Sequence, residues 1–281
     1  MYDVSVDLAN GTTVVGSSGS GPGTINDTGD GSTLGFDNTQ TFANATINLG
    51  NSSYESYLYE FDTADAGDQV LTLASSVALD VQGDAEIRSS PGRGDGIVNE
   101  GVIDITGSGG LFIIDPRTFI NSGTIDAEAT NGSLTIDPTD PATFTNSGKI
   151  DVANGETAII VPKVTGKGTD TISGAATLEF DAGVSSAKTL GSQDIDFTGG
   201  GTLHLLKPTS FYGEISDFGS GDTVELKGSW AFSAISHSHG GGVTTLTLAK
   251  GSTTHGFEFA GDYAQSNFSI HTGGVTTIKY A

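Results

Sequence analysis

A repeated eight-residue phrase constrains the fold of this chain more than any other feature of its sequence. It reads FINSGTID at residues 119–126 and FTNSGKID at residues 144–151, and a looser copy, IVNEGVID, occupies residues 97–104. The asparagines of the three copies are 22 and then 25 residues apart. Repeats of this length are typical of solenoids, in which no unit closes a core alone but stacked units do.

A second short apolar segment follows each copy at a nearly constant distance. These segments are IIDP at residues 113–116, TIDP at 135–138 and IIVP at 159–162. Each unit therefore consists of a strand, a turn, a second strand and a proline-marked corner. We predict an all-β fold, a parallel β-solenoid (β-helix), with more antiparallel strands near the C-terminus. At 22–25 residues per coil, the whole chain would form about eleven or twelve coils.

The repeat assigns structural roles to its residues. The apolar positions expected to stack inside the coils are Ile103, Ile125, Ile150, Phe119 and Phe144. The positions expected at turn corners are Asn99, Asn121 and Asn146. Asparagine tolerates left-handed backbone angles, and its amide group can pair with the same residue in the next coil. The glycine two residues after each asparagine is expected to supply the tight bend.

Composition shifts divide the chain into three parts. Residues 1–23 form a strand and a Gly/Ser-rich tether, residues 24–229 the β-solenoid, and residues 230–281 a C-terminal region of β-hairpins that caps it. In the first part Val4, Val6 and Leu8 alternate with polar residues, which indicates a half-buried strand. Because the tether leaves this strand free, we expect it to add to the open edge of a second copy.

The charge balance excludes several classes of partner. Asp and Glu outnumber Lys and Arg by 34 to 11, and the net charge is −23. Nucleic-acid binders need a basic patch, and anionic membranes attract basic segments, so neither partner is expected. No apolar stretch approaches 18 residues and the N-terminus lacks the pattern of a signal peptide, so no membrane insertion is expected. The chain has no Cys, which excludes a disulfide-stapled fold.

Two segments are candidates for metal binding. Residues 26–37 resemble a calcium loop, with oxygen-bearing residues at alternate positions, a glycine at position six and Asp37 at position twelve. Asp27 and Asp30 would supply further carboxylates, and the alternative interpretation is a turn cluster. His237 and His239 present two imidazoles near a strand end, as some zinc sites do, or belong to a polar hairpin loop. The sequence as a whole predicts no cofactor, with calcium as the alternative.

Aromatic residues gather in one segment, at Tyr54, Tyr57 and Tyr59. Exposed on an acidic surface, these rings would stack on sugars of an extracellular polysaccharide; alternatively they fill the solenoid core. Asp104, Asp126 and Asp151 are in register and could hold cations or simply face solvent. Polysaccharide lyases and hydrolases need a specific pair of acidic or basic groups, and the repeat does not single out one. We therefore expect no enzymatic activity.

Several segments after residue 167 resemble those of large secreted bacterial β-solenoid surface proteins. They are GTDTISGAATLEF at residues 168–180, FYGEISDF at 211–218, GDTVEL at 221–226 and GDYAQSNF at 261–268. The Asn-Ser-Gly units are similar to those of adhesin stalks and autotransporter passengers, and the end of the chain is similar to type I-secreted proteins. The resemblance implies a bacterial extracellular or cell-surface protein, a self-assembling fibre, matrix or adhesive-stalk subunit. A carbohydrate-binding adhesin module, or a β-helix polysaccharide lyase or hydrolase, are the alternatives.

Overall fold

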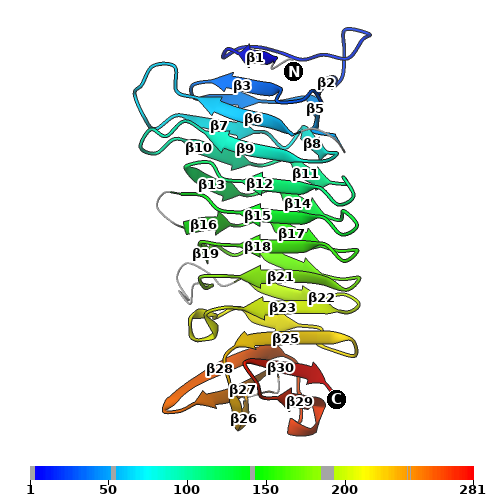
Figure 1. The fold of residues 1–281 in the computed structure, drawn as a ribbon, viewed down its shortest axis with the longest axis vertical. Helices are drawn as coiled ribbons and strands as arrows, with labels where there is room; N and C mark the ends of the chain where they lie inside the picture. The colour runs from blue at the N-terminus through cyan, green and yellow to red at the C-terminus, as the bar shows by residue number, and fades with distance from the viewer. Residues whose placement is uncertain (1–3, 52–54, 140–142, 185–192, 239, 241) are drawn as a thin grey trace.

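The computed structural model describes residues 4–51, 55–139, 143–184, 193–238, 240 and 242–281, and they form an elongated β-solenoid (Figure 1). Two long sheets run the length of the molecule, and a shorter third sheet covers part of it. Most neighbouring strands in these sheets pair in parallel, as the repeat predicted. In the described residues, no helix is long and apolar enough to cross a membrane.

The β1 sheet, named after its first strand, has twelve strands. In spatial order they are β1 (Ser5–Leu8), β3 (Thr33–Asp37), β6 (Ser56–Phe61), β9 (Ala85–Ser89), β12 (Leu111–Ile114), β15 (Ser133–Ile136), β18 (Thr157–Ile160), β21 (Ala176–Phe180), β23 (Gly201–Leu205), β25 (Asp222–Lys227), β30 (Val275–Tyr280) and β29 (Phe268–His271).

The β2 sheet also has twelve strands and lies across the core from the β1 sheet. In order they are β2 (Gly23–Asp27), β5 (Ala45–Leu49), β8 (Val77–Val81), β11 (Val102–Ile105), β14 (Thr124–Ala127), β17 (Lys149–Val152), β20 (Thr169–Ile172), β22 (Asp194–Phe197), β24 (Glu214–Ser216), β28 (Thr253–Ala260), β27 (Val243–Lys250) and β26 (Ala231–His237).

The β4 sheet has six strands and reaches neither end of the solenoid. They are β4 (Gln40–Phe42), β7 (Val70–Leu73), β10 (Gly96–Asn99), β13 (Thr118–Asn121), β16 (Thr143–Asn146) and β19 (Lys163–Thr165). Two short 3₁₀ helices, η1 (Pro208–Ser210) and η2 (Gln265–Asn267), complete the secondary structure of the described residues.

The number of coils is smaller than the repeat length suggested. Nine strands of the β1 sheet, from β3 to β25, stack in parallel. The estimate of eleven or twelve coils is wrong because the last fifty residues do not continue the solenoid. From Ala231 onward most strand pairs are antiparallel, with the parallel pair of β24 and β28 as the exception, which confirms the predicted, more antiparallel character of the C-terminal region.

The core consists of stacked side chains, as predicted. Ile103, Ile125 and Ile150 are aligned in neighbouring strands and have no exposed surface. The rings of Phe119 and Phe144 stack with centroids 5.4 Å apart and planes 8° from parallel. Since residues on a strand alternate between two faces, a constant coil length brings the same apolar position inward at each coil.

The asparagines form a buried ladder, but not at left-handed turns. Asn99 donates through Nδ2 to Oδ1 of Asn121 at 2.9 Å, and Asn121 donates in the same way to Asn146. The predicted pairing of amides between coils is thus confirmed. The expectation of left-handed corners is wrong, because all three residues end strands of the β4 sheet and point inward.

The glycines of the repeat are required for close approach between coils. A Cβ atom at Gly123 would collide with the carbonyl oxygen of Gly101, and one at Gly148 would collide with that of Gly123. These glycines therefore allow the backbones of adjacent turns to stack closely. The close contact between coils, more than the bend within one coil, requires glycine here.

Candidate assembly surface at the N-terminal end

The first strand is part of the solenoid and is not a free arm. β1 pairs in parallel with β3, and Val6 lies opposite Leu34 and Leu8 opposite Phe36. Leu34 and Phe36 are buried, so Val6 and Leu8 occupy the core-facing positions of one further rung. The expectation of a free strand on a flexible tether is wrong because one edge of β1 is already paired with β3. Only its outer edge is available.

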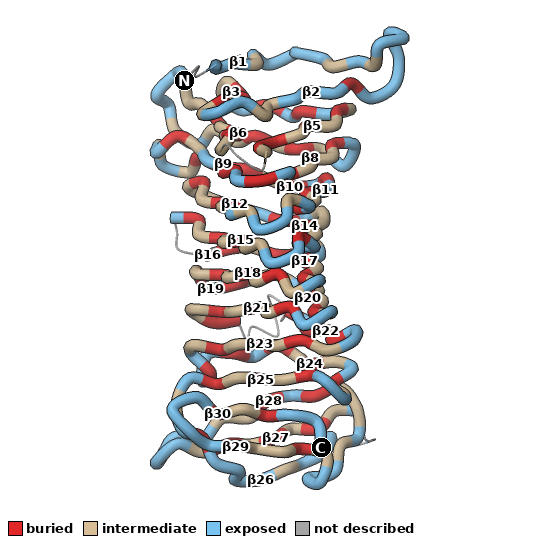
Figure 2. The backbone as a smooth tube through the Cα atoms, turned by 45° about the vertical axis from the view of Figure 1, so that its right-hand side comes forward, coloured by how far each residue is buried: buried red, intermediate tan, exposed pale blue. Residues whose placement is uncertain are grey.

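Among the described residues, this rung is incompletely covered. Val6 of β1 is 52% exposed although it lies opposite buried Leu34, and Val4, just before the strand, is 56% exposed. Across the end of the solenoid, Ile25 of β2 continues the buried column of Ile47 and is half-buried. Figure 2 shows the exposed chain after β1 that crosses this end. In the described residues, the apolar side chains of the hydrophobic core are therefore partly open to solvent at the N-terminal end.

A hollow of about 410 Å³ lies between β1 and β2. Its apolar lining consists of Val4, Val6, Leu8, Val14, Ile25 and Leu34. Exposed clusters of apolar residues with core register mark interaction sites in soluble proteins. Of the predicted strand residues, Val6 and Leu8 lie in β1, whereas Val4 directly precedes it. Val14 and Ile25 come close to them only because the chain coils.

The C-terminal end is closed by aromatic side chains. Trp230, Phe257 and Phe259 are at most 3% exposed, and Phe268 is 8% exposed. Phe268 packs against Phe259 and Tyr263, with ring centroids 5.0 and 5.7 Å apart. The two ends of the molecule are therefore unlike, one with an open core and one with a sealed core.

In each long sheet, the last strand at the C-terminal end nevertheless runs in the same direction as the parallel strands of the solenoid. In the β1 sheet, β30 is antiparallel to β25 and β29 is antiparallel to β30, so β29 runs in the direction of β25. In the β2 sheet, β28 is parallel to β24, and two antiparallel steps through β27 to β26 restore that direction. The outer edges of β29 and β26 thus have the polarity that a parallel coil requires.

The predicted aromatic residues face outward, where the structure describes them. Tyr57 and Tyr59 lie on the outer face of β6 and are half-buried, while Tyr54 lies outside the described residues. The guanidinium of Arg88 lies 5.3 Å from the centre of the Tyr57 ring, and Tyr59 stacks on Phe61 at 4.3 Å. The Tyr57 hydroxyl donates to Glu55, a bond that raises the Tyr57 pKa to about 12. The alternative of rings inside the core is excluded for these two residues.

The predicted calcium-loop residues lie on two strands and a turn. Asp27 ends β2 and is half-buried, Asp30 is exposed in the turn, and Asp37 ends β3. Burial is the main cause that raises the pKa of Asp27. Throughout the described part of the chain, no group of three or more His, Asp or Glu side chains is arranged to hold a metal ion.

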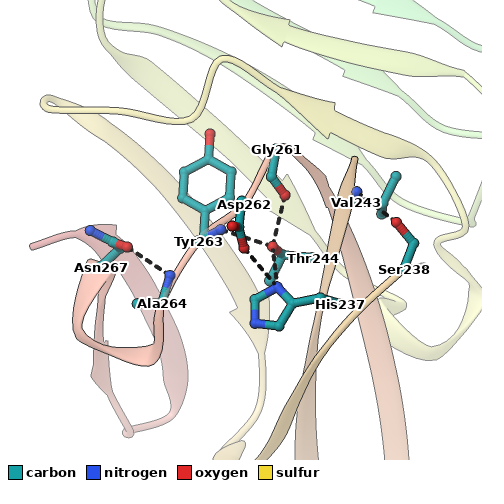
Figure 3. A network of polar contacts seen from close by, with 9 residues as sticks. All are labelled: His237, Ser238, Val243, Thr244, Gly261, Asp262, Tyr263, Ala264 and Asn267. Carbon is teal, nitrogen blue, oxygen red and sulfur yellow. Dashed lines mark hydrogen bonds and ion pairs between the residues drawn. The ribbon is translucent and has the colours of Figure 1, made fainter. Parts of the chain in front are cut away.

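His237 lies in a small polar network in the C-terminal region (Figure 3). Its Nδ1 atom is 3.2 Å from Oδ1 of Asp262 and 3.2 Å from Oγ1 of Thr244. Thr244 in turn donates to the carbonyl oxygen of Gly261 at 2.8 Å. The network ties β26 to the loop after β28. His239 lies outside the described residues, so the structure says nothing of the predicted pair.

The aspartates of the repeat form a column on the outer face of the β2 sheet. Asp104, Asp126 and Asp151 are opposite one another in successive strands, each half-buried. Burial, followed by a hydrogen bond with Asp151, raises the pKa of Asp126 to about 6. The column has the predicted register.

Among the described residues, four acidic side chains that the sequence did not mark as buried have no exposed surface: Glu60, Asp95, Glu156 and Asp170. Burial raises the pKa of Glu60 to about 8, of Glu156 to about 7 and of Asp170 to about 8. The signal for Glu60 was present, since it falls at the inward phase of the alternating segment SYLYEF.

No protein-family model matches the chain, and no curated protein is significantly similar to it in sequence. Its function is therefore inferred from the structure itself and from the segments quoted above.

Proposed function

We propose that this protein is a non-enzymatic structural subunit that associates end to end with further copies of itself. The observation that carries the proposal is the open core at the N-terminal end. There Val6 is 52% exposed although it lies in register with buried Leu34. Burying a valine side chain contributes roughly 1.5–3 kcal/mol, so a partner that covers Val4 and Val6 would form a complex stabilised by their burial.

A second copy fits this end because of strand polarity. β29 and β26 at the C-terminal end run in the same direction as β1 and β2 at the N-terminal end. Each edge strand of one molecule can therefore extend the corresponding sheet of the next as a parallel strand. Contact between two different ends is head-to-tail, and when the ends of a straight rod meet along its axis such a contact extends into a filament instead of closing into a ring.

The C-terminal end also offers apolar side chains to this contact. Phe232 of β26 and Tyr280 of β30 are each 37% exposed, and Val275 is 42% exposed. Phe232 belongs to the edge strand of the β2 sheet, which would face β2 of the next molecule. An aromatic side chain inserted at the open hollow would cover Val6 and Ile25.

The test compares the wild-type chain with Val6→Asp by light scattering over a range of concentrations and by negative-stain imaging. We expect filaments from the wild type and single rods from Val6→Asp, because a carboxylate cannot be buried without a partner. Leu111→Asp is the matched control. Leu111 is 45% exposed but lies in the middle of the rod, so this variant should still form filaments.

Three results would overturn the proposed end-to-end association. The first is a wild-type chain that remains a single rod at every concentration. The second is unchanged polymers after removal of residues 1–23. The third is unchanged polymers in a Val6→Asp variant whose circular dichroism and thermal unfolding show an intact fold. Release of unsaturated or reducing ends from acidic polysaccharides would contradict the non-enzymatic part of the proposal.

The setting we propose is the exterior of a bacterial cell, in a surface fibre, a matrix or an adhesive stalk. The resemblance of residues 168–180 and 261–268 to secreted β-solenoid proteins supports this setting. Localisation of the tagged full-length protein by cell fractionation would test it, and a signal confined to the cytoplasm would contradict it.

A carbohydrate-binding module is the second candidate function, favoured by the outward orientation of Tyr57 and Tyr59. Its difficulty is that Arg88 and Phe61 already contact these rings. Glycan-array binding that is lost in Tyr57→Ala would support it, and an identical binding profile for the two proteins would remove it.

A further inference from the structure

Two adjoining hollows lie on the side of the solenoid, below the end of the β4 sheet. The first has a volume of about 330 Å³ and is lined by Lys163, Ala182, Gly183, Val184, Lys207, Ser210 and Tyr212. The second has a volume of about 520 Å³ and is lined by Leu206, Lys207, Pro208, Thr209, Ser210, Lys227, Trp230, Lys250 and Thr253. The hollows share Lys207 and Ser210, so they form one continuous surface.

The hollows exist because the third sheet stops. Lys163 begins β19, the last strand of the β4 sheet. In the described part of the next coils, Val184 lies outside the named strands, forms an isolated bridge to Val164 of β19 and donates to the carbonyl oxygen of Ser210. Irregular segments leave recesses that a regular sheet would fill.

The charge of this surface is opposite to that of the molecule. Four of the eleven basic residues line the two hollows, in a chain whose net charge is −23, and no carboxylate is among the described residues that line them. Lys163, Lys207, Lys227 and Lys250 are all exposed. Among the described residues, none of these four lysines forms an ion pair.

Two neighbouring side chains interact with these lysines. Asp181 lies near Lys227; burial, followed by the carboxyl group of Glu179, raises the pKa of Asp181, while His204 and Lys227 act in the opposite direction. The Lys250 ammonium lies 5.9 Å from the centre of the Trp230 ring, which orients it towards the second hollow's apolar wall. The lysines are therefore available to an external anion.

The surface also offers an aromatic ring and hydroxyl groups. Tyr212 is 49% exposed at the first hollow, with its ring edge-on to His255 at 5.3 Å. Ser210, Thr209 and Thr253 are exposed and supply hydroxyl groups. Lysines bind carboxylates, an exposed aromatic ring packs on the apolar face of a sugar, and hydroxyl groups bond to sugar hydroxyls.

We propose that the two hollows form one binding site for an acidic polysaccharide, a sugar chain with carboxylate groups along its length. A chain ligand is favoured over a small anion because the lysines are distributed along two joined hollows. The site lies on the side of the rod, and the inference does not depend on end-to-end association. A rod that also assembles would present it once in every subunit.

The test measures binding of polygalacturonate, with neutral dextran as the uncharged comparison, by calorimetry on the full chain. We expect binding to polygalacturonate that weakens as salt is added, and none to dextran. Lys207→Gln combined with Lys227→Gln should weaken binding about tenfold, since each exposed ionic contact contributes modestly. Lys279→Gln removes one charge from β30, away from the hollows, and should change affinity by less than about twofold.

The sugar is distinguished from charge alone by Tyr212→Ala and by polyglutamate. We expect Tyr212→Ala to weaken binding of polygalacturonate and polyglutamate to bind more weakly than polygalacturonate. Equal binding of both polymers, unaffected by Tyr212→Ala, would overturn the proposal in favour of an acidic protein segment. No binding of polygalacturonate, or equal binding by the lysine variant, would also overturn it. Measurement on the Val6→Asp rod as well separates this result from the outcome for assembly.

Discussion

Asn146 donates a hydrogen bond through Nδ2 to Oδ1 of Asp170 at 2.8 Å, and neither residue has any exposed surface. Asp170 lies opposite Ile150 on one side and Ile195 on the other. A carboxyl group therefore occupies a place in a column of isoleucines, and it ends the asparagine ladder. Burial raises its pKa to about 8, so Asp170 is mostly protonated at neutral pH.

Replacing Asp170 should separate its hydrogen bond from its charge. Asp170→Asn keeps an acceptor for Asn146 and should change the free energy of unfolding at neutral pH by less than about 1 kcal/mol. Asp170→Ala removes the acceptor and leaves a cavity, and should cost about 1–3 kcal/mol. Urea denaturation checks both values. Equal losses in the two variants would show that the bond to Asn146 contributes nothing.

The free energy of unfolding should fall as the pH rises from about 4 to about 8. Buried Glu60 and Asp170 have pKa values raised to about 8, and Glu156 to about 7. In this window the folded chain keeps protons that the unfolded chain has released, so raising the pH favours unfolding. Above the folded pKa values both states are ionised and the effect becomes constant. Each pKa unit corresponds to about 1.4 kcal/mol for a buried group.

Denaturation at about pH 7.5 and about pH 9 isolates this effect, because histidines are then largely neutral. His255, whose pKa is lowered by burial, would destabilise the fold only at more acidic pH. The wild type should be less stable at the higher pH, and Glu60→Gln with Asp170→Asn should reduce the difference. A wild type that is equally stable at both pH values would contradict the raised pKa values of the buried carboxyl groups.

Asn121 should be the most sensitive residue of the ladder. It accepts from Asn99 and donates to Asn146, each at 2.9 Å. Asn121→Ala removes both of these bonds and the bond that Asn121 donates to the carbonyl oxygen of Lys149, and it leaves a cavity, so it should cost about 2 kcal/mol or more. The control is Ile120→Ala on the same strand, which is 40% exposed and should cost less than about 1 kcal/mol. Thermal unfolding of the two variants gives the comparison, and a smaller loss for Asn121→Ala would refute the ladder's role.

Gly123→Ala should separate adjacent coils. Its Cβ atom would collide with the carbonyl oxygen of Gly101, and backbone atoms cannot move aside as a side chain can. We expect a loss of about 2 kcal/mol or more in the free energy of unfolding. Gly242→Ala is the control, because no atom lies within 4 Å of a Cβ placed there. Equal stability of the two variants would mean that the coils have room at this turn.

The local features of the fold could be predicted because they depend on short-range periodicity. Ile103, Ile125 and Ile150 recur at nearly constant spacing, and a strand's two-residue alternation then turns each of them inward. The turn glycines were placed correctly but for an incomplete reason, since their need for close approach arises between coils. Asp170 was missed because a shorter coil moves it into the position of Ile150.

The candidate sites could be predicted only in part. Val4, Val6 and Leu8 were recognised as one strand from their alternation, yet their exposure depends on what lies above β1. The lysine surface had no signal at all in the sequence. Its four lysines come together only because coils stack, and each is 20 to 44 residues from the next along the chain: Lys163, Lys207, Lys227 and Lys250.

By itself, the sequence determined the coil: its length, its inward isoleucines and phenylalanines, and the asparagines that pair from one coil to the next. These follow from backbone periodicity and repeat spacing, which act within a few tens of residues. Only the tertiary structure decided how many coils form, which end of the core stays open, in which direction the last strands run and where charges gather. Those properties depend on contacts between coils, and a contact between distant residues leaves no periodic pattern in the chain.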